Sequence, residues 1–351
     1  MMLKFHKEVY NTVFRDPREN FELRETTSEI RYDPISGEMT RVFPLKHFQF
    51  APKDWSNIVE ESRERICPFC PTMVEKTTPM FPHELVPEGR LRHGKAIVVP
   101  NLSPYSAYAG ITILGSEHYL PLKDIPADLM VDGLKAGISF LNTVKEYDPD
   151  KGRYGSIGWN YMPFSGGSII HPHMQVLAGP VPSNTHRALL EGSRKYFQQY
   201  GLNVWAQLVA TEKNVKERYL WQSGSQHWLA TFAPRGIGDI TIVFEGKTSL
   251  GDLTANDLKE FAVGLKRIFG YYDSIHLPSF NMALYPAPEQ TPDYWLTARI
   301  VGRFTIFNYT SDISSLQMLF GDFNSIICPE QIAAEIEAPI HHIYADPTKG
   351  M

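Results

Sequence analysis

Two histidines and a glutamine occupy alternate positions in the segment His171-Pro172-His173-Met174-Gln175. Because residues two apart on an extended strand point to the same face, we expect the three side chains to share one surface. Such polar groups are costly to bury without partners, which phosphate oxygens, a metal ion or a covalent phosphoryl group would supply. The glycine-rich turn before them, with Gly167 and Ser168, would let backbone N–H groups approach an anion. The segment therefore favours nucleotidyl transfer over a solvated strand edge with incidental histidines.

The three cysteines indicate a metal site or a redox pair. Cys67 and Cys70 form a C-x-x-C knuckle, whereas Cys328 stands alone far along the chain, which argues against a disulfide framework. A redox pair is expected to open a helix in a βαβ unit, but here a proline follows the knuckle directly. A zinc site needs two more ligands. His118 and His171 are the candidates, and the Cys₂His₂ set would close a tetrahedral structural site.

Composition narrows the class of protein. The chain has 351 residues, enough for two domains or one large duplicated domain, and its 43% hydrophobic residues are ample for a packed core. A net charge of −5 argues against general affinity for nucleic acid or an anionic membrane. No run of about 18 apolar residues occurs, and no apolar signal core follows the first methionine. These features predict a cytoplasmic enzyme.

The chain repeats a pattern of strand, turn, amphipathic helix and strand at a spacing of about 120 to 130 residues. The expected elements lie at 111–113, 124–128, 129–144 and 158–162, and again at 240–242, 252–257, 258–271 and 279–282. Each helix follows a cluster of Asp, Thr or Asn residues able to cap it. In this register Thr297 and Arg299 fall opposite His171 and His173. If the chain is duplicated, only the first half carries the histidines. The alternative is that the two segments share only the turn and cap residues common to many α+β segments.

From about Glu29 to Glu335 the chain resembles the galactose-1-phosphate uridylyltransferases, a branch of the histidine-triad superfamily. Residues 31–38 are similar to the family's opening strand and turn, and residues 227–230 to the start of its second half. The resemblance implies an α+β fold of two fused histidine-triad-like units, with antiparallel sheets and packed helices. It implies an N-terminal half over residues 1–195 with the zinc site and nucleophile, a degenerate half over 196–351, and a homodimer.

The resemblance also assigns the site residues. His173 matches the nucleophile and Gln175 its partner, while Asn160 and Ser168 match the phosphate-site positions. The zinc ligands of the family correspond to Cys67, Cys70, His118 and His171. Further candidates for substrate contact are Gly167, Asn101 and Lys46.

Three departures from the family pattern affect the substrate and metal predictions. Where the family commonly has an arginine pair for the nucleotide phosphates, the chain offers only Lys46 and His47. The second metal site of some members corresponds to Tyr285, Thr297 and Arg299, so we expect no metal there. The hexose-recognition segment is represented loosely by residues 317–324. Galactose is therefore not secured as the sugar, although UDP-hexose remains the favoured substrate.

The side chains suggest a double displacement. A neutral imidazole is a competent nucleophile near pH 7, so His173 can attack the α-phosphorus of a nucleotide sugar and release a sugar 1-phosphate. The backbone carbonyl of His171 can accept a hydrogen bond from one ring nitrogen of His173 and so aim the other. Gln175, Ser168 and Asn160 can donate to phosphoryl oxygens. Histidine-triad hydrolases carry a third histidine where Gln175 stands, and glutamine cannot transfer a proton, which favours a transferase over a hydrolase.

Three functions are therefore weighed. The first is a nucleotidylyltransferase that exchanges a nucleoside monophosphate between a nucleotide sugar and a sugar 1-phosphate. The second is a phosphorylase of an adenine nucleotide sugar, of the ADP-glucose type, with inorganic phosphate as acceptor. The third is a zinc-stabilised nucleotide-binding protein without turnover, which the intact His171, His173 and Gln175 argue against.

Overall fold

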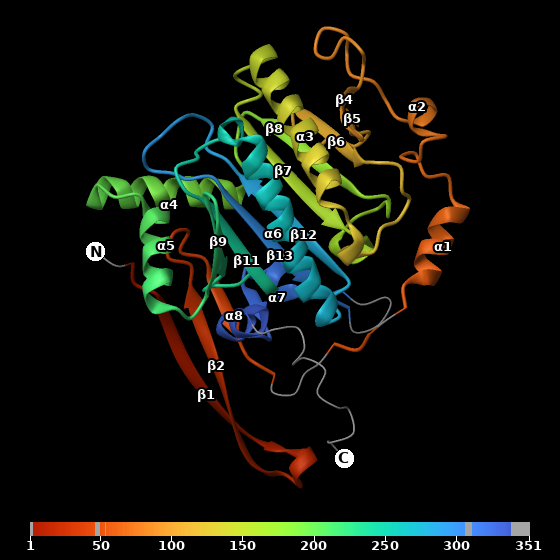
Figure 1. Cartoon of the computed structure of the whole chain (residues 1–351). Helices are drawn as coiled ribbons and strands as arrows, with labels where there is room; N and C mark the ends of the chain where they lie inside the picture. Colours follow the sequence, from red (N-terminus) through yellow and green to blue (C-terminus); the bar gives the residue numbers. More distant parts are fainter. Residues whose placement is uncertain (1–2, 46–49, 53, 306–310, 338–351) are drawn as a thin grey trace.

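A ten-stranded antiparallel sheet forms the centre of the molecule (Figure 1). The computed structural model describes residues 3–45, 50–52, 54–305 and 311–337. The strands of this sheet lie in the spatial order β4 (Leu91–His93), β5 (Ala96–Pro100), β6 (Tyr108–Leu114), β8 (His173–Gly179), β7 (Tyr154–Tyr161), β12 (Ser279–Tyr285), β13 (Thr297–Arg303), β11 (Ile237–Phe244), β10 (Gln226–Ala230) and β9 (Tyr219–Ser223).

The strand order is symmetric about the centre of the sheet. From one edge it runs β4-β5-β6-β8-β7, from the other β9-β10-β11-β13-β12, and β7 pairs with β12 where the two sets meet. A long helix follows the third strand of each set in the chain: α3 (Ala127–Tyr147) follows β6, and α6 (Ala255–Ser274) follows β11. This arrangement agrees with the predicted α+β class of two antiparallel units with packed helices. Helix α4 (Asn184–Tyr200) continues across residue 195, so the division into residues 1–195 and 196–351 stays a prediction.

Helices α3 and α6 cover one face of the sheet (Figure 1). The strand side chains that point to this face are buried and mostly apolar. On β8 the buried Met174 and Val176 point to this face, and His173 and Gln175 to the other. Thr254 caps α6 and forms a capping box with Asp257, as the sequence predicted. The cap predicted for α3 is wrong, because Pro126 holds the N-cap position and proline has no side-chain acceptor.

A second, smaller sheet joins the two ends of the chain. Its order is β1 (His6–Asp16), β2 (Glu22–Tyr32), β3 (Met39–Val42) and β14 (Phe323–Ser325), with β14 parallel to β3. Strands β1 and β2 form a long ribbon that extends from the body (Figure 1). The remaining helices are α1 (Ser56–Glu64), α2 (Val74–Thr77), α5 (Val204–Val215), α7 (Ser315–Met318) and α8 (Pro329–Glu337). Among the described residues, no helix combines the length and apolar character that crossing a membrane requires.

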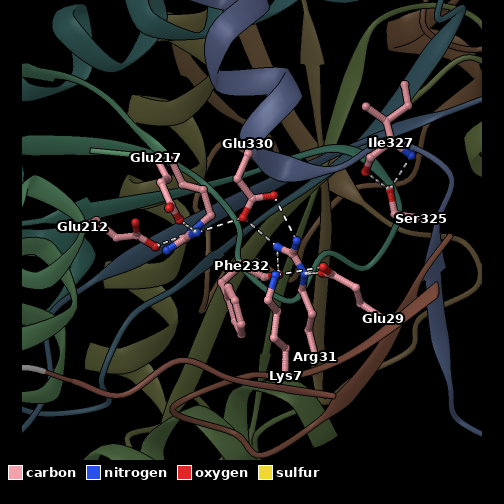
Figure 2. Close-up of polar contacts among 10 residues, drawn as sticks. Lys7, Glu29, Arg31, Glu212, Glu217, Phe232, Ser325, Ile327 and Glu330 are labelled. Atoms are coloured by element: carbon pink, nitrogen blue, oxygen red, sulfur yellow. Dashed lines mark hydrogen bonds and ion pairs between the residues drawn. The ribbon is translucent and has the colours of Figure 1, made fainter. Parts of the chain in front are cut away.

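Buried charges attach the smaller sheet and α8 to the second half of the large sheet (Figure 2). Glu330, in the first turn of α8, accepts hydrogen bonds from Arg31 Nη1 at 2.9 Å, Arg31 Nη2 at 3.0 Å and Arg218 Nη1 at 2.8 Å. Both guanidinium groups are almost fully buried and lie about 5 Å from the centre of the Phe232 ring. Burial raises the pKa of Glu330, but its bonds to Arg31 and Arg218 outweigh burial and lower the pKa to about 2.

We expect Glu330→Gln to lower the free energy of unfolding by about 2 kcal/mol at pH 7, because two buried guanidinium groups lose a charged partner. The depressed pKa of Glu330 means that its contribution is complete above the ordinary pKa near 4.5 and is lost as pH falls towards 2. Urea denaturation at a series of pH values measures both effects. The curves of the wild type and the variant should converge between pH 4.5 and 2.

Glu217→Gln is the matched control, since Glu217 also bonds Arg218 but its side chain is 57% exposed. Its effect should stay within about 0.5 kcal/mol. An equal loss in both variants would contradict the special weight given to Glu330.

Candidate active site and metal centre

Four side chains with metal-binding atoms meet beside the start of β8. They are Cys67, Cys70, His118 and His171, and their ligand atoms all lie within 4.8 Å of one another. The Sγ atom of Cys70 is 3.3 Å from His118 Nδ1 and 3.8 Å from His171 Nδ1, and Cys67 Sγ is 4.0 Å from His171 Nδ1. A tetrahedral ion with bonds of 2.0–2.3 Å needs ligand separations of about 3.3–3.8 Å. Two of the three separations fall in this range and the third, at 4.0 Å, is slightly longer, so the close approach and the donor types of the cluster fit a metal ion.

Hydrogen bonds outside the cluster fix both histidine rings for metal binding. Ser62 Oγ donates to the Val59 carbonyl at 2.6 Å, so it accepts from His118 Nε2, which lies 2.8 Å away. His171 Nε2 is 3.2 Å from the carbonyl of Gly115, which can only accept. In both rings the proton is therefore on Nε2, and the Nδ1 lone pair points towards the sulfur atoms.

Burial favours the neutral form of these groups. It lowers the pKa of His171 to about 4, and together with the Cys67 thiol it raises the pKa of Cys70 to about 11. Neutral imidazole is the form that binds metals, whereas a thiol must lose its proton to become a ligand. A bound cation would supply the positive charge that stabilises the thiolates.

The cysteine knuckle is a tight turn on the face of the sheet opposite α3. The Cys70 N–H donates to the Cys67 carbonyl at 3.3 Å, and the short helix α2 begins at Val74. Cys67 and Phe69 pack on Ile111 and Ile113 of β6, which lie on this face. The short turn and the four-residue helix after it do not form a βαβ unit, so the local structure matches a metal knuckle better than a redox motif.

His173 is the first residue of β8 and lies on the same face as the knuckle. Its Nδ1 is 2.8 Å from the carbonyl oxygen of His171, which can only accept, so Nδ1 carries the proton and Nε2 carries the lone pair. Burial lowers the pKa of His173, although the hydrogen bond to His171 opposes this effect. The ring of Phe69 meets that of His173 edge-on, with centroids 5.2 Å apart. His173 is thus held as a neutral imidazole with one aimed nitrogen.

The expectation that His171, His173 and Gln175 share one face agrees with the structure, although His171 itself lies outside a strand. This residue precedes β8, and its side chain turns to the cysteines. Pro172 lies between the two histidines and its carbonyl accepts from the Leu114 N–H at 2.9 Å. His173 and Gln175 alone follow the strand alternation.

Gln175 and Asn160 border a cavity of about 550 Å³ on this face, within the range of small-molecule sites. The second half contributes Asn281 and Arg303, and Met318 and Asn324 come from the segment around α7 and β14. The cavity thus spans the seam between the two sets of strands. The Gln175 side chain has no hydrogen-bond partner among the described residues, so its amide is available to a ligand.

The glycine-rich turn packs closely against the backbone of Asn160. Gly166 adopts a left-handed conformation with φ of 87°, and a Cβ atom on Gly167 would lie 3.1 Å from the Asn160 carbonyl oxygen. Ser168 is exposed. Gly167 and Ser168 therefore lie next to the site, but they do not line the cavity.

Asn101, another predicted substrate contact, lies elsewhere. Asn101 follows β5 and its Oδ1 accepts from the Ser103 N–H at 2.9 Å, an ordinary turn contact away from the cavity. Lys46 lies outside the described residues.

In the second half, the sequence register predicted that Arg299 matches His173, and Arg299 lies on β13. Its guanidinium makes an ion pair with the fully buried Asp239, with Nη2 to Oδ2 at 2.7 Å, and the pKa of Arg299 is raised by that carboxylate although burial opposes it. Thr297 is buried beside it, and Tyr285 lies across on β12. An arginine cannot act as a neutral metal ligand, and here it is bound to a carboxylate.

Sequence reasoning missed four residues that shape the site: Ser62, Phe69, Asn281 and Arg303. The Asn281 and Ser62 contacts join residues 121 and 56 positions apart, and no local pattern marks such pairs. Phe69 lies inside the knuckle, so its position between the cysteines was the one available signal.

Comparisons with known proteins agree with this fold. No family model matches the chain. An uncharacterized protein of Archaeoglobus fulgidus is 29% identical over 316 residues, which cover 90% of this chain and 93% of that protein. An ADP-glucose phosphorylase from Arabidopsis thaliana with bound ADP-glucose is similar with a TM-score of 0.69 and 20% identity, over 89% of this chain and 99% of that one. A uridylyltransferase is similar with a TM-score of 0.67 and 20% identity, over 90% of this chain and 99% of that one. The chain therefore has the fold of these proteins, as the resemblance predicted.

Proposed function

We propose that the protein is a nucleotidylyltransferase that transfers a nucleoside monophosphate between a nucleotide sugar and a sugar 1-phosphate through a covalent nucleotidyl-histidine at His173. UDP-hexose is the favoured donor. The observation that carries the proposal is the tautomer of His173: its Nδ1 donates to the His171 carbonyl, so Nε2 presents a lone pair beside Gln175.

In the first step, Nε2 of His173 attacks the α-phosphorus of the donor. A phosphorus–nitrogen bond forms, and the bond from the α-phosphorus to the bridging oxygen breaks. Both electrons of the broken bond leave with the sugar 1-phosphate. The Nδ1 proton stays on the ring, where the His171 carbonyl stabilises the positive imidazole.

In the second step, a phosphate oxygen of the acceptor attacks the same phosphorus and the phosphorus–nitrogen bond breaks, which regenerates neutral His173. The amides of Gln175 and Asn160 face the cavity where both sugar phosphates must bind, and they can donate to phosphoryl oxygens. The leaving group is already a stable phosphate anion. It therefore needs no proton, which suits a glutamine beside the nucleophile.

We propose that zinc occupies the Cys₂His₂ cluster and has a structural role. Sulfur and imidazole nitrogen are the ligands zinc prefers in closed four-coordinate sites, and all four ligands come from the protein. Bound zinc would fix His171, and through its carbonyl the ring of His173. The homodimer and the cytoplasmic location implied earlier stay predictions.

A nucleotide-sugar panel tests the function. UDP-, ADP- and GDP-sugars are first compared by thermal shift, since a ligand at a hundred times its dissociation constant adds about 2.7 kcal/mol of stability. The nucleotide sugar that stabilises the protein most is then labelled in its α-phosphate and incubated with the protein without an acceptor. The label should become covalently bound, stable to base and labile to acid, and a sugar 1-phosphate should discharge it.

Discharge by inorganic phosphate alone, after labelling by an ADP-sugar, would instead indicate the phosphorylase. Binding without covalent label for every donor would overturn the proposal in favour of a protein without turnover.

We expect Gln175→His to raise hydrolysis of the nucleotidyl-histidine relative to transfer by about tenfold or more, because the new imidazole can move protons to and from water beside the phosphorus. The half-life of the isolated labelled protein in buffer measures this. Gln175→Glu is a matched control in which a carboxylate would repel the substrate phosphates. It should slow labelling without shortening the half-life. An unchanged half-life in Gln175→His would refute the role given to glutamine.

A further inference from the structure

A chain of side-chain hydrogen bonds crosses the seam between β7 and β12. Asn160 and Asn281 are paired residues of these strands, and Asn281 Nδ2 donates to Asn160 Oδ1 at 2.7 Å. Asn281 Nδ2 also donates to the Ser165 carbonyl at 2.9 Å, and Asn281 Oδ1 accepts from Arg303 Nη1 at 2.6 Å. Arg303 is held by Asp312, which accepts from its Nε at 2.8 Å.

The direction of this chain is fixed by its two ends. A guanidinium can only donate and a carbonyl can only accept, so Asn281 must present Oδ1 to Arg303 and Nδ2 to Ser165. The Nδ2 group of Asn281 also donates to Asn160, so Asn160 must accept this bond with its Oδ1. The orientation of the Asn160 amide, normally ambiguous between oxygen and nitrogen, is thereby determined.

The consequence is that Asn160 turns its Nδ2 group away from Asn281, at the border of the cavity. Among the described residues this Nδ2 group has no hydrogen-bond partner. Two N–H groups are therefore available beside Gln175, at a place where phosphate oxygens need donors. In the opposite orientation Asn160 would present a lone pair to an anion.

We propose that Arg303 and Asn281 are positioning residues of the second half that lock the Asn160 amide as a donor to the substrate phosphate. The proposal rests on the proposed function for the identity of that substrate. It also gives the second half a part in the reaction, because its polar residues set the amide of a first-half strand. Asn281 in addition holds the Ser165 carbonyl, and with it the glycine-rich turn.

Single-turnover labelling of His173 by the nucleotide sugar is the first test. Asn160→Ala should slow labelling by about 100-fold, the usual cost of one phosphate donor. Asn281→Asp should slow it at least as much, although the two residues have nearly the same shape. The carboxylate accepts from Arg303 but cannot donate, so the Asn160 amide must reverse. Asn281→Ala leaves the amide free to rotate and should cost about tenfold.

The added charge in Asn281→Asp is separated from the amide reversal by salt. Charge repulsion of the substrate should weaken between 50 mM and 500 mM salt, whereas a reversed amide should not. Thermal melts of each variant check folding. Recovery of wild-type rates at high salt would overturn the proposal.

A double-mutant cycle tests whether Arg303 acts through Asn160. Arg303→Gln should slow labelling by about tenfold, because glutamine can orient either way, and Arg303→Lys, which still only donates, should stay within about threefold of the wild type. In the Asn160→Ala background, Arg303→Gln should change the rate by less than about twofold. A purely structural role predicts the same tenfold loss in both backgrounds and would overturn the proposal.

A binding test separates this proposal from the proposed function. In protein with ¹⁵N-labelled asparagine, the Asn160 side-chain amide signal is assigned by its loss in Asn160→Ala. Inorganic phosphate and a nucleoside monophosphate should shift this signal in the wild type, and not in Asn281→Asp. A shift without any covalent label would sink the proposed function and leave the positioning role standing. Labelling of Asn281→Asp at the wild-type rate, with the same amide shift, would refute the positioning role and leave the proposed function standing.

Discussion

His173→Ala is expected to abolish covalent labelling by the nucleotide sugar and to slow exchange between sugar 1-phosphates by on the order of 10⁴-fold or more. The reason is that Nδ1 of His173 holds the ring proton, so Nε2 carries a lone pair, and His173 shares its strand face with Gln175, whose amide lines the cavity. Rapid quench of a labelled donor measures the first effect, and isotope exchange between donor and sugar 1-phosphate measures the second.

Metal content separates loss of the nucleophile from loss of structure. His173 is not in the Cys₂His₂ cluster, so His173→Ala should keep its metal and melt close to the wild type. His83→Ala is a matched control, because His83 is exposed and bonds only the Pro87 carbonyl in a loop. It should label normally. Full exchange activity in His173→Ala would mean direct transfer between the two substrates, or a different site.

Side-chain alternation and ligand chemistry were readable from the sequence because both are local. Met174 and Val176 point into the core under α3, so His173 and Gln175 must point to the open face. The C-x-x-C spacing gave Cys67 and Cys70 as candidate ligands, and the resemblance to the family supported the candidates His118 and His171. His171 lies just before β8, and its ring joins the cysteines on the same side of the sheet as His173.

The contacts that complete the site are long-range, and the sequence holds no signal for them. Pairing of β7 with β12 brings Asn281 to Asn160 at the centre of the sheet, and α3 packs against α6 on one of its faces. Glu330 meets Arg31 across 299 residues of chain, because the ends of the chain share the smaller sheet. Helix caps are local, but the cap predicted for α3 was wrong, since Pro126 took the position.

Loss of the proposed zinc should have the largest effect on stability. Cys67→Ser is expected to reduce zinc from one ion per chain to nearly none and to lower the free energy of unfolding by about 4 kcal/mol or more. Cys67 is buried with Phe69 on β6, so without an ion its knuckle would depend on a small apolar cluster and a few hydrogen bonds. Metal analysis by mass spectrometry and urea denaturation measure the two effects.

Cys328→Ser is the matched control, because Cys328 is also a free cysteine but lies beside Arg31 and Glu330, apart from the metal cluster. It should keep one zinc ion per chain. Cys67→Ser should also slow labelling of His173, even though it leaves the nucleophile in place. The His171 carbonyl that aims the imidazole would lose its anchor if the proposed zinc no longer held His171. Unchanged zinc content in Cys67→Ser would show that the metal, if bound, is held elsewhere. Zinc loss with unchanged labelling would show that the hydrogen bond from His171 Nε2 to the Gly115 carbonyl, together with the pairing of β8 and β6, suffices to aim His173.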